Sequence, residues 1–150
     1  MSQNTTTHFR LAAAVGGALS IGLLLSACGA IDTAMKSAAD AWSVTYEVTT
    51  DSADPVALTE VSYLDMETRT SGQSTVRVPD ATTAADGAGL PRWTAETIVI
   101  TGDSASVSAT PPEGVAASCR ILLDGKREIA AETGQPGEPV RCDEVTPKFD

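Results

Sequence analysis

Apolar and polar residues alternate along the chain from residue 44 onward. The segment 44–49, Val-Thr-Tyr-Glu-Val-Thr, has an apolar side chain at every second position. This period, with β-branched and aromatic residues, predicts a strand with one face buried. Further strands are expected at 57–64, 74–78, 93–100, 104–110, 117–123, 126–132 and 139–145. The chain is therefore expected to form an all-β domain.

Two connections between these strands have distinct compositions. Asp124-Gly125 lies between apolar-rich segments, and this dipeptide favours the positive φ angles of a two-residue hairpin loop. A hairpin is therefore predicted there. By contrast, residues 79–91 are rich in Ala, Thr, Gly and Asp without a period. They are predicted to form a long flexible loop.

The N-terminal segment has the features of an export signal. An apolar run from Leu11 to Leu25 follows Arg10, and the small residues Ser26 and Ala27 lead to Cys28. An apolar stretch with a cation before it and small residues after it is typical of a secretory signal peptide. Leu-Ser-Ala-Cys looks like a bacterial lipobox, in which the Cys receives diacylglycerol and acyl chains such as palmitate. The alternatives are an uncleaved transmembrane anchor and an ordinary signal peptide with a chance Cys.

The lipobox interpretation divides the chain into three parts. Residues 1–27 would be the lipoprotein signal peptide, 28–42 the lipidated Cys28 with a tether, and 43–150 one β domain. Two or more acyl chains anchor a protein stably, here on the extracytoplasmic (periplasmic) face of the cell membrane. A short amphipathic helix is possible in the tether, because apolar residues recur there at helical spacing. These are Ile31, Ala34, Met35 and Ala38.

Composition argues against several kinds of function. One of the 10 basic residues, Arg10, lies in the signal, so cleavage changes the net charge from −10 to −11, which disfavours nucleic-acid binding. The single histidine, His8, also lies there, so a processed chain has no imidazole for a catalytic triad or a zinc site. Gly87-Ala88-Gly89 lacks the Lys of a phosphate-binding loop. We expect no enzyme, metal or cofactor, although paired carboxylates remain possible in principle.

Two cysteines remain beside Cys28. An even pair in an oxidising compartment favours a disulfide between Cys119 and Cys142. Cys119 is in phase with Ile121 and Cys142 with Val140, so both thiols are expected to reach an apolar interior from adjacent strands. Two free thiols are the alternative; a redox pair is disfavoured because the CxxC spacing is absent.

The order of these motifs resembles one family. The segment 119–126, Cys-Arg-Ile-Leu-Leu-Asp-Gly-Lys, followed by Arg141-Cys142 and preceded by the strand at 44–49, is similar to the MmpS family over about residues 43–145. Leu-Pro-Arg-Trp at 90–93 echoes a Leu-Pro-Trp element of that family with Arg92 inserted. Family members commonly carry an uncleaved transmembrane helix, whereas this chain has a lipobox.

The resemblance implies a fold, a partner and a function. The fold would be an immunoglobulin-like β-sandwich of seven to eight strands. The protein would be a non-catalytic accessory subunit of an RND (MmpL-type) transporter that exports lipids, siderophores or drugs. The alternative is a stand-alone envelope lipoprotein that binds a small hydrophobic ligand or another envelope protein.

Three residues are predicted to contact a partner. Trp93 offers a large aromatic surface, unless it belongs to the core, and Asp124 and Gly125 offer a projecting turn. Trp42, at the junction of tether and domain, either sits at the headgroup level of the membrane or packs inside the domain.

Overall fold

The computed structural model describes residues 39–85 and 89–149. The predicted signal peptide, Cys28, the helix in the tether and Gly87-Ala88 lie outside these residues. Everything that is regular in the described part is β-strand. The strands are β1 (Ala41–Thr50), β2 (Ala57–Asp65), β3 (Ser74–Val78), β4 (Ala81–Thr82), β5 (Arg92–Ile100), β6 (Ser104–Thr110), β7 (Ala117–Leu123), β8 (Arg127–Thr133) and β9 (Val140–Val145).

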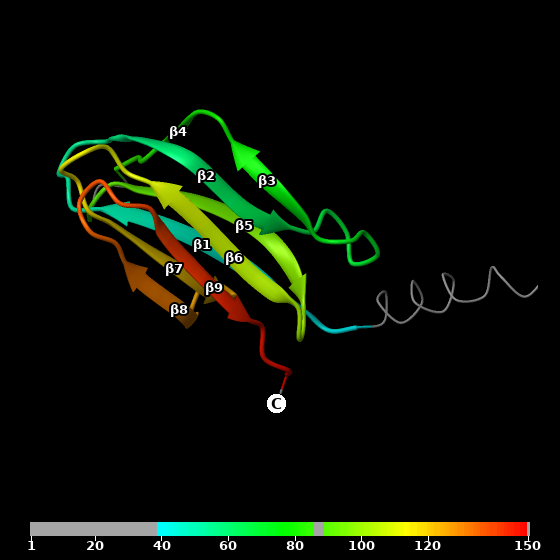
Figure 1. The fold of residues 1–150 in the computed structure, drawn as a ribbon. Coiled ribbons are helices and arrows are strands. Elements are labelled where there is room, and N and C mark those ends of the chain that lie inside the picture. The colour runs from blue at the N-terminus through cyan, green and yellow to red at the C-terminus, as the bar shows by residue number, and fades with distance from the viewer. Residues whose placement is uncertain (1–38, 86–88, 150) are drawn as a thin grey trace, which may run out of the picture.

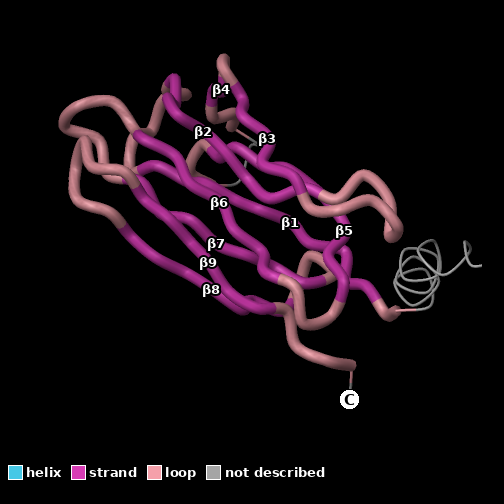
Figure 2. The backbone as a smooth tube through the Cα atoms, turned by 45° about the vertical axis from the view of Figure 1, so that its right-hand side comes forward, coloured by secondary structure: helices cyan, strands magenta, loops and turns pink. Residues whose placement is uncertain are grey.

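The strands form two antiparallel sheets that pack face to face (Figures 1 and 2). The first sheet has the order β5-β1-β7-β8. The second has the order β3-β2-β6-β9, with β4 also paired to β2. The predicted all-β sandwich is therefore confirmed.

Several predicted boundaries need correction. β1 begins at Ala41, ahead of the expected strand at 44 and the expected domain start at 43, because its first residues pair with the end of β5: Trp42 lies opposite Val99. β8 and β9 each begin one residue later than predicted.

The described part of the predicted loop, residues 79–85 and 89–91, is more ordered than expected and adds a ninth strand to the seven or eight predicted. Its two-residue strand β4 pairs with the start of β2, and Ala84 pairs with Arg92. Thr83 is buried, and its hydroxyl accepts a hydrogen bond from the Val56 amide at 2.9 Å. The composition of this segment does not predict these specific contacts.

The core lies between the sheets and follows the period of two. Val44, Tyr46 and Val48 of β1 are fully buried. The Tyr46 hydroxyl donates to the Leu64 carbonyl of the second sheet at 2.9 Å. Burial raises the pKa of Tyr46 to about 12. The other fully buried large side chains are Leu58, Val61, Val99, Val107, Ile121 and Leu123, together with Thr50, Thr83 and Thr146.

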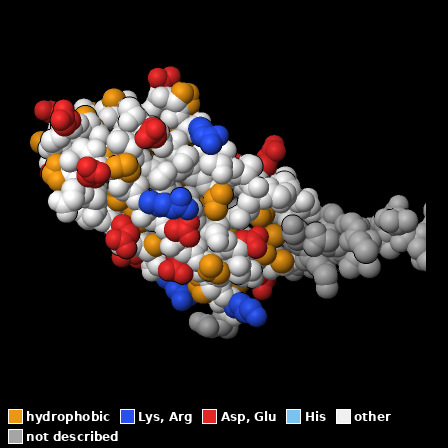
Figure 3. Space-filling view, in the orientation of Figure 1, with side chains coloured by type: hydrophobic (Ala, Val, Ile, Leu, Met, Phe, Trp, Pro, Cys, Tyr) orange, Lys and Arg blue, Asp and Glu red, His pale blue; other side chains and the backbone are white. Residues whose placement is uncertain are grey.

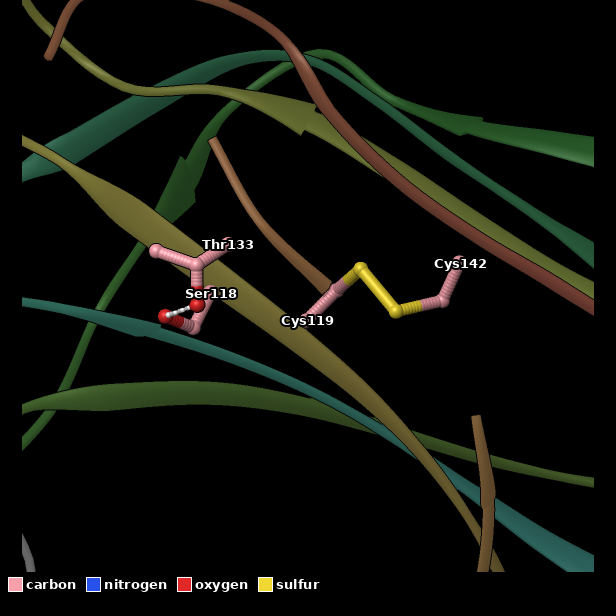
Figure 4. The surroundings of a disulfide bond; sticks show 4 residues. All are labelled: Ser118, Cys119, Thr133 and Cys142. Carbon is pink, nitrogen blue, oxygen red and sulfur yellow. Dashed lines mark hydrogen bonds between the residues drawn. A yellow bond between two sulfur atoms is a disulfide. The ribbon is translucent and has the colours of Figure 1, made fainter. Parts of the chain in front are cut away.

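The predicted disulfide joins Cys119 to Cys142, with the two Cα atoms 5.9 Å apart (Figure 4). The expectation of adjacent strands was wrong. Cys119 lies on β7 of the first sheet and Cys142 on β9 of the second, so the bond crosses the core. Both side chains point inward in the predicted phase, but phase alone does not distinguish a neighbouring strand from a facing one. The neighbours of β7 in its own sheet are β1 and β8, and Ser118 of β7 shares a hydrogen bond of 2.8 Å with Thr133 of β8.

Candidate partner-binding surfaces

Trp93 lies on β5, the edge strand of the first sheet, opposite Val48. Its side chain therefore shares the inward face of that sheet. The ring is half-buried, and its centroid is 5.9 Å from that of Tyr63 on the second sheet. Tyr63 in turn lies 5.6 Å from Tyr46. Trp93 thus packs against the core at the open edge between the sheets, and only part of the ring is available to a partner.

The Asp124-Gly125 turn has the predicted geometry. Both residues have positive φ, 50° and 65°, and the Lys126 amide donates to the Leu123 carbonyl at 3.0 Å. The Asp124 amide also donates to the Ser43 carbonyl of β1 at 2.7 Å. Asp124 and Gly125 are both exposed. The turn is therefore accessible and fixed to two strands.

The structure does not bring these predicted contact residues together. Trp93 is level with Val48 of β1, whereas the turn is bonded to Ser43. Five residues of strand separate these levels, which corresponds to about 17 Å. A single partner surface containing both would have to run along the length of the sandwich.

A row of charges crosses the outer face of the first sheet. Glu47 of β1 lies between Arg92 of β5 and Arg120 of β7, with nitrogen to oxygen distances of 3.5 and 2.5 Å. Arg120 also reaches Glu128 of β8 at 3.6 Å. Because the guanidinium groups cover it, Glu47 is only 8% exposed although it faces away from the core. We call these four residues the outer charged row.

Sequence reasoning missed the outer charged row. Each of its residues occupies a polar position of an alternating strand, where a solvated side chain is the ordinary expectation. The row requires the strand order β5-β1-β7-β8 and its register, in which Glu47 is opposite Arg120. The sequence contains no signal for that order.

Beside the outer charged row lies an open depression of about 470 Å³. Thr45, Glu96 and Leu122 line it, together with Gly125 of the predicted turn and Arg92. Its lining is mixed in polarity. It connects the turn to Arg92, the residue next to Trp93, along the outside of the sheet.

A groove of about 590 Å³ runs between β8 and β9. In the described part of the chain, each of these strands is paired on one side only, so the groove lies between two sheet edges. Ile129, Val140 and Arg141 contribute to its lining. Arg141 donates to Asp143 at 2.9 Å and lowers the pKa of that carboxyl. Sheet edges can accept an additional strand, so the groove is a further candidate contact.

Within residues 39–85 and 89–149, no group of three Cys, His, Asp or Glu side chains is arranged to hold a metal ion. The same residues include no helix with the length and apolar character needed to cross a membrane.

The chain matches no protein-family model and no curated protein sequence. The resemblance to the MmpS family therefore depends on the motifs between residues 43 and 145, and the function that it implies is a proposal.

Proposed function

We propose that this protein is an extracytoplasmic lipoprotein, attached to the cell membrane through Cys28, that acts as a non-catalytic accessory subunit of an RND (MmpL-type) transporter. The observation that carries the proposal is the lipobox-like sequence at residues 25–28, which ends thirteen positions before the start of a small disulfide-linked β-sandwich. The order of motifs in that domain resembles the MmpS family, and this resemblance suggests the MmpL-type transporter as the partner. Export of lipids, siderophores or drugs is the process that follows from the resemblance.

The architecture suits a role based on contact. A sandwich closed by a disulfide keeps its shape outside the cell, where disulfides persist. Acyl chains on Cys28 would hold it beside an integral membrane protein and raise its local concentration there. The accessible surfaces described above are the exposed part of Trp93, the turn at Asp124 and Gly125, and the edges of β8 and β9.

The partner is testable by affinity purification from detergent-solubilised membranes, followed by mass spectrometry. We expect a transporter with about a dozen transmembrane helices to co-purify with the wild type. Cys28→Ser should remove the acylation site and reduce this recovery, because the domain is released or kept as a precursor. If the wild type carries its lipid and no transporter is enriched over a control lipoprotein, the proposal is wrong.

Two variants locate the contact. Trp93→Ala and Gly125→Val should each reduce co-purification, whereas Leu90→Ala, at an exposed apolar side chain, should not. Because both variants also affect folding, each must retain its circular dichroism spectrum and its disulfide. If both fold, keep their lipid and bind fully, the contact lies elsewhere.

The groove between β8 and β9 favours a second candidate, a lipoprotein that binds another envelope protein through strand addition. An adjacent gene that encodes a large transporter would favour the first candidate. Recovery of a different envelope protein in the same purification would favour the second.

A further inference from the structure

The chain enters the sandwich and leaves it at the same end. β1 begins at Ala41, and the segment after β9 returns to the same end, where Gly102 donates to the Thr146 carbonyl (Figure 1). We call this the tether end. The opposite end, formed by the loops 51–56, 111–116 and 134–139 and by the segments 79–85 and 89–91, is the distal end.

Aromatic side chains meet at the tether end. The Trp42 indole donates its N–H to the Pro147 carbonyl at 2.7 Å, and its ring stacks on Phe149 with centroids 4.0 Å apart and planes at 12°. Trp42 is half-buried, whereas Phe149 is 46% exposed. Val145, also near this end, is 52% exposed. Leu90, on the distal side, is the other exposed large hydrophobic residue in the described part of the chain.

The distal end is also more acidic than the tether end. The described distal loops have five carboxylates and no Lys or Arg; the carboxylates are Asp51, Asp54, Asp80, Glu113 and Glu138. The loops of the tether end balance three cations against three carboxylates: Arg69, Lys126 and Lys148 against Glu67, Asp103 and Asp124. Asp40, just before β1, adds one carboxylate there. On the face shown in Figure 3, the end away from the grey trace displays Asp and Glu without Lys or Arg.

The distance to the lipid is short. Thirteen residues, Cys28 to Asp40, precede β1, and a chain of that length spans at most about 45 Å. Trp side chains favour the headgroup level of a bilayer, Phe side chains insert at the boundary between headgroups and acyl chains, and exposed lysines are attracted to anionic lipid. The acidic distal end is repelled by the same lipid.

We propose that the domain docks on the bilayer through its tether end, with Trp42, Phe149 and Lys148 at the headgroup level and the distal end facing away. This inference rests on the lipid anchor of the proposed function but not on the transporter. Docking in this orientation would determine which surfaces of the domain can contact a partner embedded in the membrane. The turn at Asp124 and Gly125 lies at the tether end. Trp93 lies about 20 Å further out than Trp42, because it is six residues along β5 from Val99, the residue opposite Trp42.

The two tryptophans of the chain provide a matched experiment. The full-length lipoprotein is purified as Trp93→Phe, which leaves Trp42, and as Trp42→Phe, which leaves Trp93. Each is inserted in vesicles of phosphatidylcholine and phosphatidylglycerol, with or without bromine on the upper acyl carbons. We expect brominated lipid to lower the emission of Trp42 roughly twofold and to leave that of Trp93 almost unchanged, because only Trp42 is at the interface. Equal quenching of both, or none of Trp42, would overturn the proposal.

A second pair of variants tests the exposed ring. In the chain that retains Trp42, Phe149→Ala should weaken the quenching, and Leu90→Ala should not change it. Quenching unaffected by Phe149→Ala, or weakened equally by Leu90→Ala, would contradict the role given to Phe149. The mass of the N-terminal peptide in each sample separates the two hypotheses. Without diacylglycerol on Cys28 the anchor itself is refuted, whereas a lipidated protein with unquenched Trp42 refutes only the docking.

Discussion

The two faces of the first sheet are held by different forces. Its inner face is apolar and is joined to the second sheet by the Cys119–Cys142 bond. Its outer face has the outer charged row, in which Glu47 is shielded by two arginines. Salt does not screen apolar burial or a covalent bond, whereas it does screen ion pairs near water. The inner face should therefore determine stability, and the outer face should contribute little and be free for recognition.

Removal of the disulfide should have the largest effect. The double variant Cys119→Ala, Cys142→Ala should lose about 3 kcal/mol of unfolding free energy, because the loop between these cysteines, 23 positions apart, is no longer closed in the unfolded chain. Urea unfolding at neutral pH measures this loss. A loss below about 1 kcal/mol would mean that the apolar core alone holds the sheets together.

A change at the turn between β7 and β8 should have the next largest effect. Gly125→Ala places a Cβ at a φ of 65° and should cost about 1–2 kcal/mol. Gly72→Ala is the matched control, since Gly72 has no such φ and a Cβ there meets open space. Equal stability of the two variants in urea would show that the turn is not strained by a side chain.

Disruption of the outer charged row should cost less. Glu47→Gln leaves Arg92 and Arg120 without their shared carboxylate, and we expect a loss of about 1 kcal/mol at low salt that decreases at high salt. Glu96→Gln, an exposed position on the same face, is the control and should be neutral. A loss similar to that of the disulfide variant would reverse the ranking of the two faces.

Loss of the Tyr46 hydroxyl should have an effect of similar size at neutral pH, and it should also change how stability depends on pH. Tyr46→Phe removes the hydrogen bond to Leu64 and should cost about 1 kcal/mol. Burial raises the pKa of Tyr46 to about 12 in the folded state, whereas it is 10 in the unfolded chain. The contribution of the buried phenol to the free energy of unfolding is therefore fully present below pH 10 and declines as pH rises from 10 to 12. Unfolding midpoints across this range should fall for the wild type and remain flatter for Tyr46→Phe. Parallel curves would contradict the assignment.

The sequence predicted what depends on local pattern. Alternation identified the inward side chains of β1, and Asp124-Gly125 identified its turn, because both are determined by neighbouring residues. What depends on strand order was not predictable. The position of Cys142 on the facing sheet, the outer charged row and the pairing of β4 with β2 all arise from segments distant in the chain. The contact of Trp42 with Phe149 joins residues 107 positions apart, for which the sequence contains no local signal.

The intact mass of the protein purified from membranes under non-reducing conditions tests the central claim most directly. A lipid-anchored, disulfide-linked sandwich predicts a chain that begins at Cys28, carries diacylglycerol, and is two hydrogens lighter than its reduced form. A chain that retains residues 1–27, or one with an unmodified Cys28, would contradict the account of how this domain is held at the membrane.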